Sequence, residues 1–196
     1  MRAWWLHQTL EMKIAHQCAP VLAGVKPSNM LVLDNKYLRD VVRSLEGTGL
    51  SWRCLYAGSE KNIWLLYRKD ALEQWVLQKE ALDFLNTYNY REITLDRLLD
   101  RFGQRFREYR NNTKEIGFPH EMGVFLGYPM ADVKGFIENE GKNYLYSGYW
   151  KIYADVEATK ELFRTYEKVR KVFVEEAGKG KNLWQITREW QYQMAC

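Results

Sequence analysis

A chain of 196 residues with 46% hydrophobic and 28% charged residues has the composition of an ordinary globular protein, long enough to bury a core without disulfides or metals. The net charge of +4, from 29 basic and 25 acidic residues, is too balanced for the basic face of a nucleic-acid-binding protein. No apolar run approaches the ~20 residues of a membrane span, and the N-terminus lacks the apolar core of a signal peptide. We therefore predict one cytoplasmic domain over residues 1–196, with neither nucleic acid nor membrane as a partner.

The first third of the chain predicts helices followed by a hairpin. Apolar residues at helical spacing predict a helix over residues 4–16. Pro20 favours the first turn of a short second helix, and Pro27 limits where that helix ends. The next segments predict an amphipathic helix and two strands joined by a turn, at 35–46, 50–56 and 62–68.

Helices dominate the remainder of the chain. Apolar periodicity predicts them at 70–87, 94–110, 132–140, 156–177 and 182–194. Thr94 is the expected N-cap of the second of these. A glycine-bounded loop at 117–123 runs into a predicted short strand at 124–128, and residues 144–154 predict a further strand or strand pair. The first two predicted strands form a hairpin and the later ones are separated by helices along the chain. We therefore predict an α+β fold with a small antiparallel sheet packed with helices.

Cys18 is the first candidate for chemistry. If Pro20 occupies the first turn of a helix, Cys18 lies near its N-cap, where free N–H groups and the helix dipole stabilise a thiolate. A thiolate is the nucleophilic form of cysteine. The alternative is that Cys18 is buried and packs as a small apolar side chain. For Cys54, in the middle of a predicted strand, and Cys196, at the end of the sequence, we favour this non-reactive role.

His120 is the second candidate. It lies between a proline and Glu121 in the glycine-bounded loop, and loops of this kind display side chains toward a cleft. An imidazole can deprotonate a thiol when a third group orients its ring, and Glu121, Asp132 or Asn143 are the candidates for that group. The alternative is a structural histidine held by hydrogen bonds.

A zinc or iron site formed by His16, Cys18, His120 and Glu121 is a weaker alternative, because the spacing of these residues matches no established ligand motif. Arginines at positions 97, 101 and 105 lie on one face of the predicted helix and would suit an acidic partner such as a carrier protein, although charged runs are more often solvated faces. Aromatic residues make up 15% of the chain, a surplus that suits a pocket for flat or extended organic groups.

Three stretches of the sequence carry a family resemblance: CAPVLAGVK at 18–26 with SNML at 28–31, FPHEMGVFLGYPMADVKGFI at 118–137, and GYWKIY at 148–153. They resemble the signatures of a family of uncharacterised proteins from Firmicutes, mainly clostridia. The signatures are built around Cys18, His120 and Glu121, and the order of the cysteine and the histidine resembles that of papain-like cysteine enzymes. The resemblance implies an enzyme that joins acyl chains to amines in non-ribosomal peptide assembly, of the thioamide antibiotic type.

The leading hypothesis is therefore a cysteine acyltransferase without a cofactor, in a papain-like arrangement. Cys18 would accept an acyl chain from a thioester, carried by a small molecule or a carrier protein. His120 and Glu121 would then assist its transfer to a small amine. Tyr128, Tyr149 and Trp150 are the expected substrate-binding residues. The alternative from another class is a non-catalytic protein that holds a ligand in this aromatic region.

Overall fold

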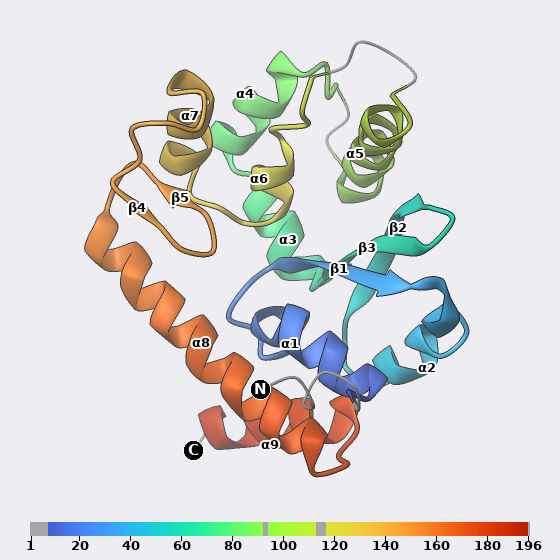
Figure 1. Cartoon of the computed structure of the whole chain (residues 1–196). Helices are drawn as coiled ribbons and strands as arrows, with labels where there is room; N and C mark the ends of the chain where they lie inside the picture. Colours follow the sequence, from blue (N-terminus) through green and yellow to red (C-terminus); the bar gives the residue numbers. More distant parts are fainter. Residues whose placement is uncertain (1–7, 92–93, 113–116, 196) are drawn as a thin grey trace. The chain divides into compact units, whose positions relative to one another are not determined.

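The computed structural model describes residues 8–91, 94–112 and 117–195, which form two compact units (Figure 1). The first unit contains Met1–Arg68 and Tyr166–Cys196, and the second contains Lys69–Thr165. Helices and small antiparallel sheets build the chain, so the predicted α+β class is confirmed. The single-domain boundary and the papain-like arrangement stay predictions. Among the described residues, no helix is long and apolar enough to cross a membrane.

The first unit contains a three-stranded antiparallel sheet in the order β1-β3-β2. Its strands are β1 (Ser28–Asp34), β2 (Ser51–Ala57) and β3 (Lys61–Tyr67). The hairpin of β2 and β3 confirms the predicted strand pair. Strand β1 was not predicted, although its short apolar run between Pro27 and Asn35 is typical of a buried strand. It makes β3 the central strand, and this explains why five of the seven residues of β3 are buried.

Helix α1 (Leu10–Leu22) packs against β1, and α9 (Leu183–Ala195) packs against α1 (Figure 1). The predicted helix over 35–46 is divided into the 3-10 helix η2 (Asn35–Tyr37) and α2 (Val41–Leu45). The part of the predicted N-terminal helix before residue 8 lies outside the described residues. Apolar side chains from α1, the sheet, α9 and the long helix α8 (Val156–Gly178) form the core of this unit, among them Ile14, Leu22, Leu31, Leu66 and Phe173.

The end of α1 corrects the prediction of a second helix opening at Pro20. The helix begins after its N-cap Thr9 and continues through Pro20 as far as Leu22. It ends because Gly24 adopts a positive φ of 78°, and the Val25 N–H donates to the Pro20 carbonyl at 3.0 Å. Pro20 lies inside the helix, two residues before its end, where it cannot donate the backbone hydrogen bond that another residue would form with the preceding turn. Cys18 therefore lies inside a helix rather than at its N-terminus.

The second unit is mainly helical. Thr94 is the N-cap of its longest complete helix, as predicted, and the predicted helix over 70–87 is divided in two near Leu77. Phe102 and Phe125 stack at the centre of this unit with ring centroids 4.5 Å apart. The elements are α3 (Lys69–Val76), α4 (Lys79–Thr87), α5 (Leu95–Arg110), α6 (Met122–Phe125), α7 (Met130–Glu138) and the hairpin β4 (Tyr146–Ser147) and β5 (Lys151–Ile152). Helix α8 (Val156–Gly178) begins in this unit and ends in the first.

The strand predicted at 124–128 is wrong, because this segment contains the end of the short helix α6 followed by a turn. Gly127 ends the helix with a φ of 69°, and the Tyr128 N–H donates to the Gly123 carbonyl at 2.9 Å. A short apolar run does not distinguish a buried strand from a buried helix. The predicted helix at 132–140 and strand pair at 144–154 are confirmed as α7 and the β4–β5 hairpin.

Lys26 gives the first unit an expected pH-dependent stability. Its side chain is buried, and loss of solvation lowers its pKa from 10.5 to about 8. Between pH 8 and pH 9 the unfolded chain keeps a proton on Lys26 that the native state loses, so stability rises with pH. We expect the unfolding free energy of the wild type to rise by about 1 kcal/mol relative to Lys26→Met over this range, measured by urea titration. Equal pH profiles for the two proteins would contradict this.

Candidate functional site

Cys18 lies in the core of the first unit. Its side chain is fully buried among apolar residues, and its thiol lies 3.7 Å from the Met30 carbonyl oxygen, to which it can donate. Burial raises the pKa of the thiol, although the nearby Lys26 ammonium acts in the opposite direction. A helix N-terminus and access to solvent both favour a thiolate, and Cys18 has neither.

We expect Cys18 to resist thiol reagents while the protein is folded. With excess iodoacetamide at pH 7, the half-buried Cys54 should be alkylated, and Cys18 should be alkylated only after denaturant is added. Peptide mass spectrometry of the two cysteines measures this difference, with Cys54 as the internal control. Faster labelling of Cys18 than of Cys54 in the native protein would contradict the buried position.

His120 and Glu121 lie in a tight turn of the second unit, directly before α6. The His120 N–H donates to the Phe118 carbonyl at 2.9 Å, and the Met122 N–H donates to the Pro119 carbonyl at 3.0 Å. This turn sends the two adjacent side chains to different surroundings. The imidazole lies between the Phe118 and Phe136 rings, with centroid distances of 5.2 Å and 5.8 Å. Its pKa is lowered by loss of solvation, against the opposing charge of Glu121, so the neutral ring is favoured at pH 7.

The Glu121 carboxylate forms no hydrogen bond with His120 in this structure, and its expected role in a catalytic triad stays a prediction. It is fully buried and accepts hydrogen bonds from Arg105 Nε and from the Tyr90 hydroxyl, the latter at 3.3 Å. Its second oxygen and Nδ1 of His120 are both buried without a hydrogen-bond partner. Arg105, predicted on a solvated arginine face, thus turns inward from α5 to pair with this carboxylate. Glu121 is placed to hold the turn that presents His120.

The two other candidates for the orienting group are not bonded to His120 either. Asp132 is buried and accepts three hydrogen bonds, from Trp150 Nε1 at 2.8 Å and from the backbone N–H groups of Tyr153 and Ala154 at 2.7 Å and 3.1 Å. Asn143 is exposed and donates to the side chain of a residue in the preceding turn. Cys18 belongs to the first unit and His120 to the second, and the proposed catalytic pairing stays a prediction.

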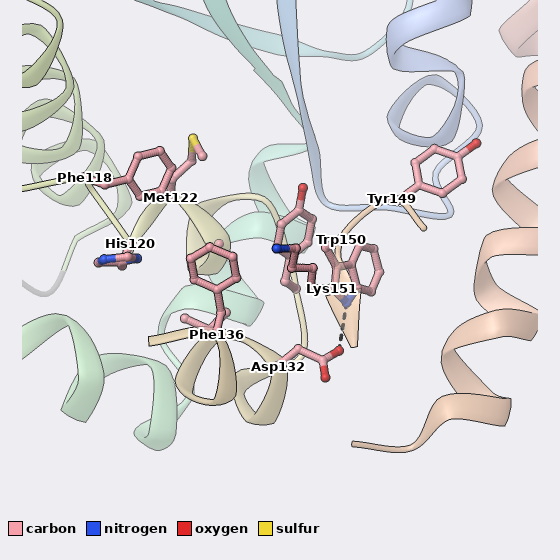
Figure 2. A pocket seen from close by; sticks show the side chains of 11 residues that line it. Phe118, His120, Met122, Asp132, Phe136, Tyr149, Trp150 and Lys151 are labelled. Atoms are coloured by element: carbon pink, nitrogen blue, oxygen red, sulfur yellow. Dashed lines mark hydrogen bonds between the residues drawn. The ribbon is translucent and has the colours of Figure 1, made fainter. Parts of the chain in front are cut away.

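A pocket of about 240 Å³ lies entirely within the second unit (Figure 2). The turn before α6, helix α7 and the β4–β5 hairpin form its walls, and six of its eleven lining residues carry rings. Figure 2 shows the His120 and Phe136 rings beside each other and the Tyr149 ring farther away, next to α8. The lining residues are Phe118, His120, Met122, Gly123, Tyr128, Asp132, Val133, Phe136, Tyr149, Trp150 and Lys151.

Trp150 is the centre of the ring contacts on the hairpin side of the pocket. Its indole stacks on Tyr128 with centroids 4.5 Å apart, and Phe163 meets its plane edge-on at 4.6 Å. The hydrogen bond from the indole N–H to Asp132, dashed in Figure 2, ties the hairpin to α7. Rings held by stacking and by a hydrogen bond to a buried carboxylate form a wall whose geometry exists before any ligand arrives.

Lys151 is the one lysine or arginine among the lining residues. Its ammonium donates to the Gly141 carbonyl at 2.6 Å and lies 4.8 Å from the Tyr144 ring centroid and 5.8 Å from that of Phe136. Within the described residues, no carboxylate pairs with it at ion-pair distance. The pocket therefore contains a cation that protein carbonyl and ring contacts orient but that no acidic side chain neutralises.

Several of the residues predicted from the sequence to form the functional site line this pocket. Tyr128, Tyr149 and Trp150, the expected substrate-binding residues, all line it together with His120. Sequence reasoning missed Phe118, Met122, Phe136 and Lys151. Their signal was present, because each belongs to one of the signature stretches that also contain the predicted residues. Whether these residues bind a substrate stays a prediction.

A metal centre receives no support from the described residues. Among them, no group of three or more histidine, cysteine, aspartate or glutamate side chains is close enough to hold a metal ion. His16 and Cys18 belong to the first unit, and His120 and Glu121 to the second.

Comparison with known proteins gives one match. A family model described as a protein of unknown function, DUF3793, matches residues 14–187. No curated protein and no solved structure matches the chain. The matched range includes Cys18, the His120 turn and the whole lining of the pocket.

Proposed function

The chain belongs to the family of proteins of unknown function DUF3793, and we propose that it binds a small organic molecule with a flat aromatic part in the pocket of its second unit. The observation that carries this proposal is the ring-lined cavity itself. It is concave, mostly apolar and equipped with a few polar groups, which is the usual composition of a ligand site.

The size and shape of the cavity support a ligand of one or two fused rings. A protein cavity of about 150 Å³ is enough for benzene. The volume here is about 240 Å³, which is large enough for a bicyclic ring. The rings of Phe118, Phe136 and Tyr128 offer both faces and edges, which suit the stacked and edge-on contacts of an aromatic guest.

The orphaned His120 nitrogen supplies a polar anchor. Nδ1 of this ring is buried and has no hydrogen-bond partner, and an unsatisfied buried polar atom costs about 1–3 kcal/mol. A ligand group that hydrogen-bonds to Nδ1 recovers part of this free energy. The neutral imidazole accepts or donates there according to its tautomer, so the anchor suits either kind of partner.

Ligand-observed NMR with naphthalene, quinoline, 2-naphthamide and 2-naphthoate tests the proposal. We expect at least one fragment to bind the wild type. Phe118→Ala should weaken that binding about fivefold, because an aromatic contact contributes roughly 1 kcal/mol. The Phe118 side chain is 42% exposed, so its removal leaves the core of the unit intact. Tyr192→Ala is the control, since this exposed tyrosine belongs to the first unit. Absence of binding by all four fragments, or equal losses in both variants, would contradict the proposal.

The acyltransferase hypothesis stays a prediction that requires Cys18 to become accessible. Intact-mass spectrometry with an acyl thioester tests it: a covalent adduct on the wild type that is absent from Cys18→Ala would support it. The buried thiol and the hydrogen bonds of Glu121 to Arg105 and Tyr90 are reasons to expect no adduct.

A further inference from the structure

We infer, building on the proposed function, that the ligand of this pocket is an aromatic anion whose carboxylate or similar group pairs with the Lys151 ammonium. The inference names the chemical class of the ligand. It rests on the position of a cation that lacks an acidic partner in a ring-lined cavity.

The first step of the argument is the orientation of Lys151. Its Nζ donates to the Gly141 carbonyl, and the Phe136 and Tyr144 rings lie within 6 Å of the ammonium. These contacts direct the ammonium along the aromatic wall instead of into bulk solvent. A lysine ammonium has three donors, and the Gly141 carbonyl occupies one of them.

The second step is the charge balance of the pocket. Asp132 is the one acidic side chain that lines it, and its oxygens are already occupied by Trp150 Nε1 and by two backbone N–H groups. Asp132 forms no ion pair with Lys151. The hydrogen bonds stabilise the Asp132 charge locally, and the Lys151 charge is left to attract an anion from solution.

The third step places the two polar anchors around one ring. The His120 ring centroid and the Lys151 ammonium each lie 5.8 Å from the centroid of Phe136. A flat ligand lying against Phe136 therefore has a cation and a neutral imidazole nitrogen at its rim. In the tautomer that carries its proton on Nδ1, the neutral imidazole can donate to an anionic oxygen, although more weakly than the charged ammonium does from Nζ. A neutral apolar ligand would leave the Lys151 charge without an anionic partner and His120 Nδ1 without a hydrogen bond.

The matched pair 2-naphthoate and 2-naphthamide tests the inference, because the two molecules share one shape and differ in charge. Titration calorimetry on the full chain should show at least tenfold tighter binding of the naphthoate. Lys151→Gln should abolish this preference by weakening the naphthoate alone, and Lys151→Arg should retain it. Lys142→Gln, at an exposed lysine outside the pocket, should change neither affinity. Circular dichroism checks that each variant is folded.

The outcomes separate this inference from the proposed function. Equal binding of naphthoate and naphthamide, or a preference that survives Lys151→Gln, would overturn the anionic ligand class and leave the aromatic pocket supported. Failure of both molecules to bind would overturn the inference, and the proposed function falls with it only when naphthalene and quinoline also fail to bind. A preference that disappears in Lys151→Gln and persists in Lys151→Arg supports both.

Discussion

Replacing Asp132 by alanine should lower the unfolding free energy of the second unit by about 3–5 kcal/mol, because one buried and two partly buried donors lose a shared charged acceptor. Its carboxylate, 2% exposed, accepts from Trp150 Nε1 and from the backbone N–H groups of Tyr153 and Ala154. Trp150 is itself buried, with 8% of its surface exposed, so water replaces the lost acceptor least well at its indole N–H. The same change should abolish fragment binding, because the hairpin wall of the pocket is no longer tied to α7.

Urea unfolding followed by tryptophan fluorescence measures this effect. Asp132→Asn should lose less than Asp132→Ala, because the amide keeps one oxygen acceptor of the same shape. Asp83→Ala is the control, since Asp83 forms an exposed pair with Lys79 on α4 and such pairs contribute about 0–1 kcal/mol. A loss at Asp132 no larger than that at Asp83 would show that the three hydrogen bonds do not hold the hairpin.

Glu121→Leu is expected to have the second large effect, about 3–5 kcal/mol, since it leaves the Arg105 guanidinium without its buried counter-charge. Glu121 is fully buried, and the Arg105 side chain is 15% exposed. The Tyr90 hydroxyl, which donates to the same carboxylate, also loses its acceptor. Part of the loss should be offset, because the substitution also removes the Glu121 oxygen that is buried without a hydrogen-bond partner in the native state.

A double-mutant cycle separates the ion pair from the cost of isolating one charge. The double variant Glu121→Leu with Arg105→Met should be more stable than Glu121→Leu alone, because apolar side chains of similar size replace a buried ion pair at little cost. Denaturant titration of the four proteins gives the coupling free energy. Strictly additive losses would mean that the two side chains do not stabilise each other in solution.

The substitutions of Asp132 and Glu121 should affect the candidate site as well as the stability of the second unit, because both residues hold elements that carry residues of the pocket. Glu121 holds the turn from which His120 projects, and Asp132 holds the hairpin that carries Trp150 and Lys151. Ligand binding in each variant should therefore be compared without urea, at a temperature at which circular dichroism shows that the variant is folded. If a folded Asp132→Asn variant no longer binds the ligand, Asp132 positions the wall of the pocket in addition to stabilising the fold.

Local signals in the sequence were sufficient for most elements of the fold. The β2–β3 hairpin, the helix that starts after Thr94 and the long helix α8 follow from apolar periodicity and turn residues, which act within a few positions along the chain. One residue is a weaker guide, because its local preference competes with the packing of the whole element. Pro20 was expected to open a helix and instead lies in the last turn of α1, because the apolar contacts of the whole helix outweigh the preference of one residue.

By itself, the sequence determined the α+β class, most helices and the stretches from which the candidate site is built, because these depend on short-range periodicity and on contiguous motifs. The tertiary structure alone decided the surroundings of each chemical group. Contacts between distant segments bury Cys18 beside the Met30 carbonyl, pair Glu121 with Arg105 instead of His120, and bring Lys151 to the Phe136 ring. Burial and partner identity set the chemistry of a thiol, a carboxylate or an ammonium, and neither follows from residue spacing.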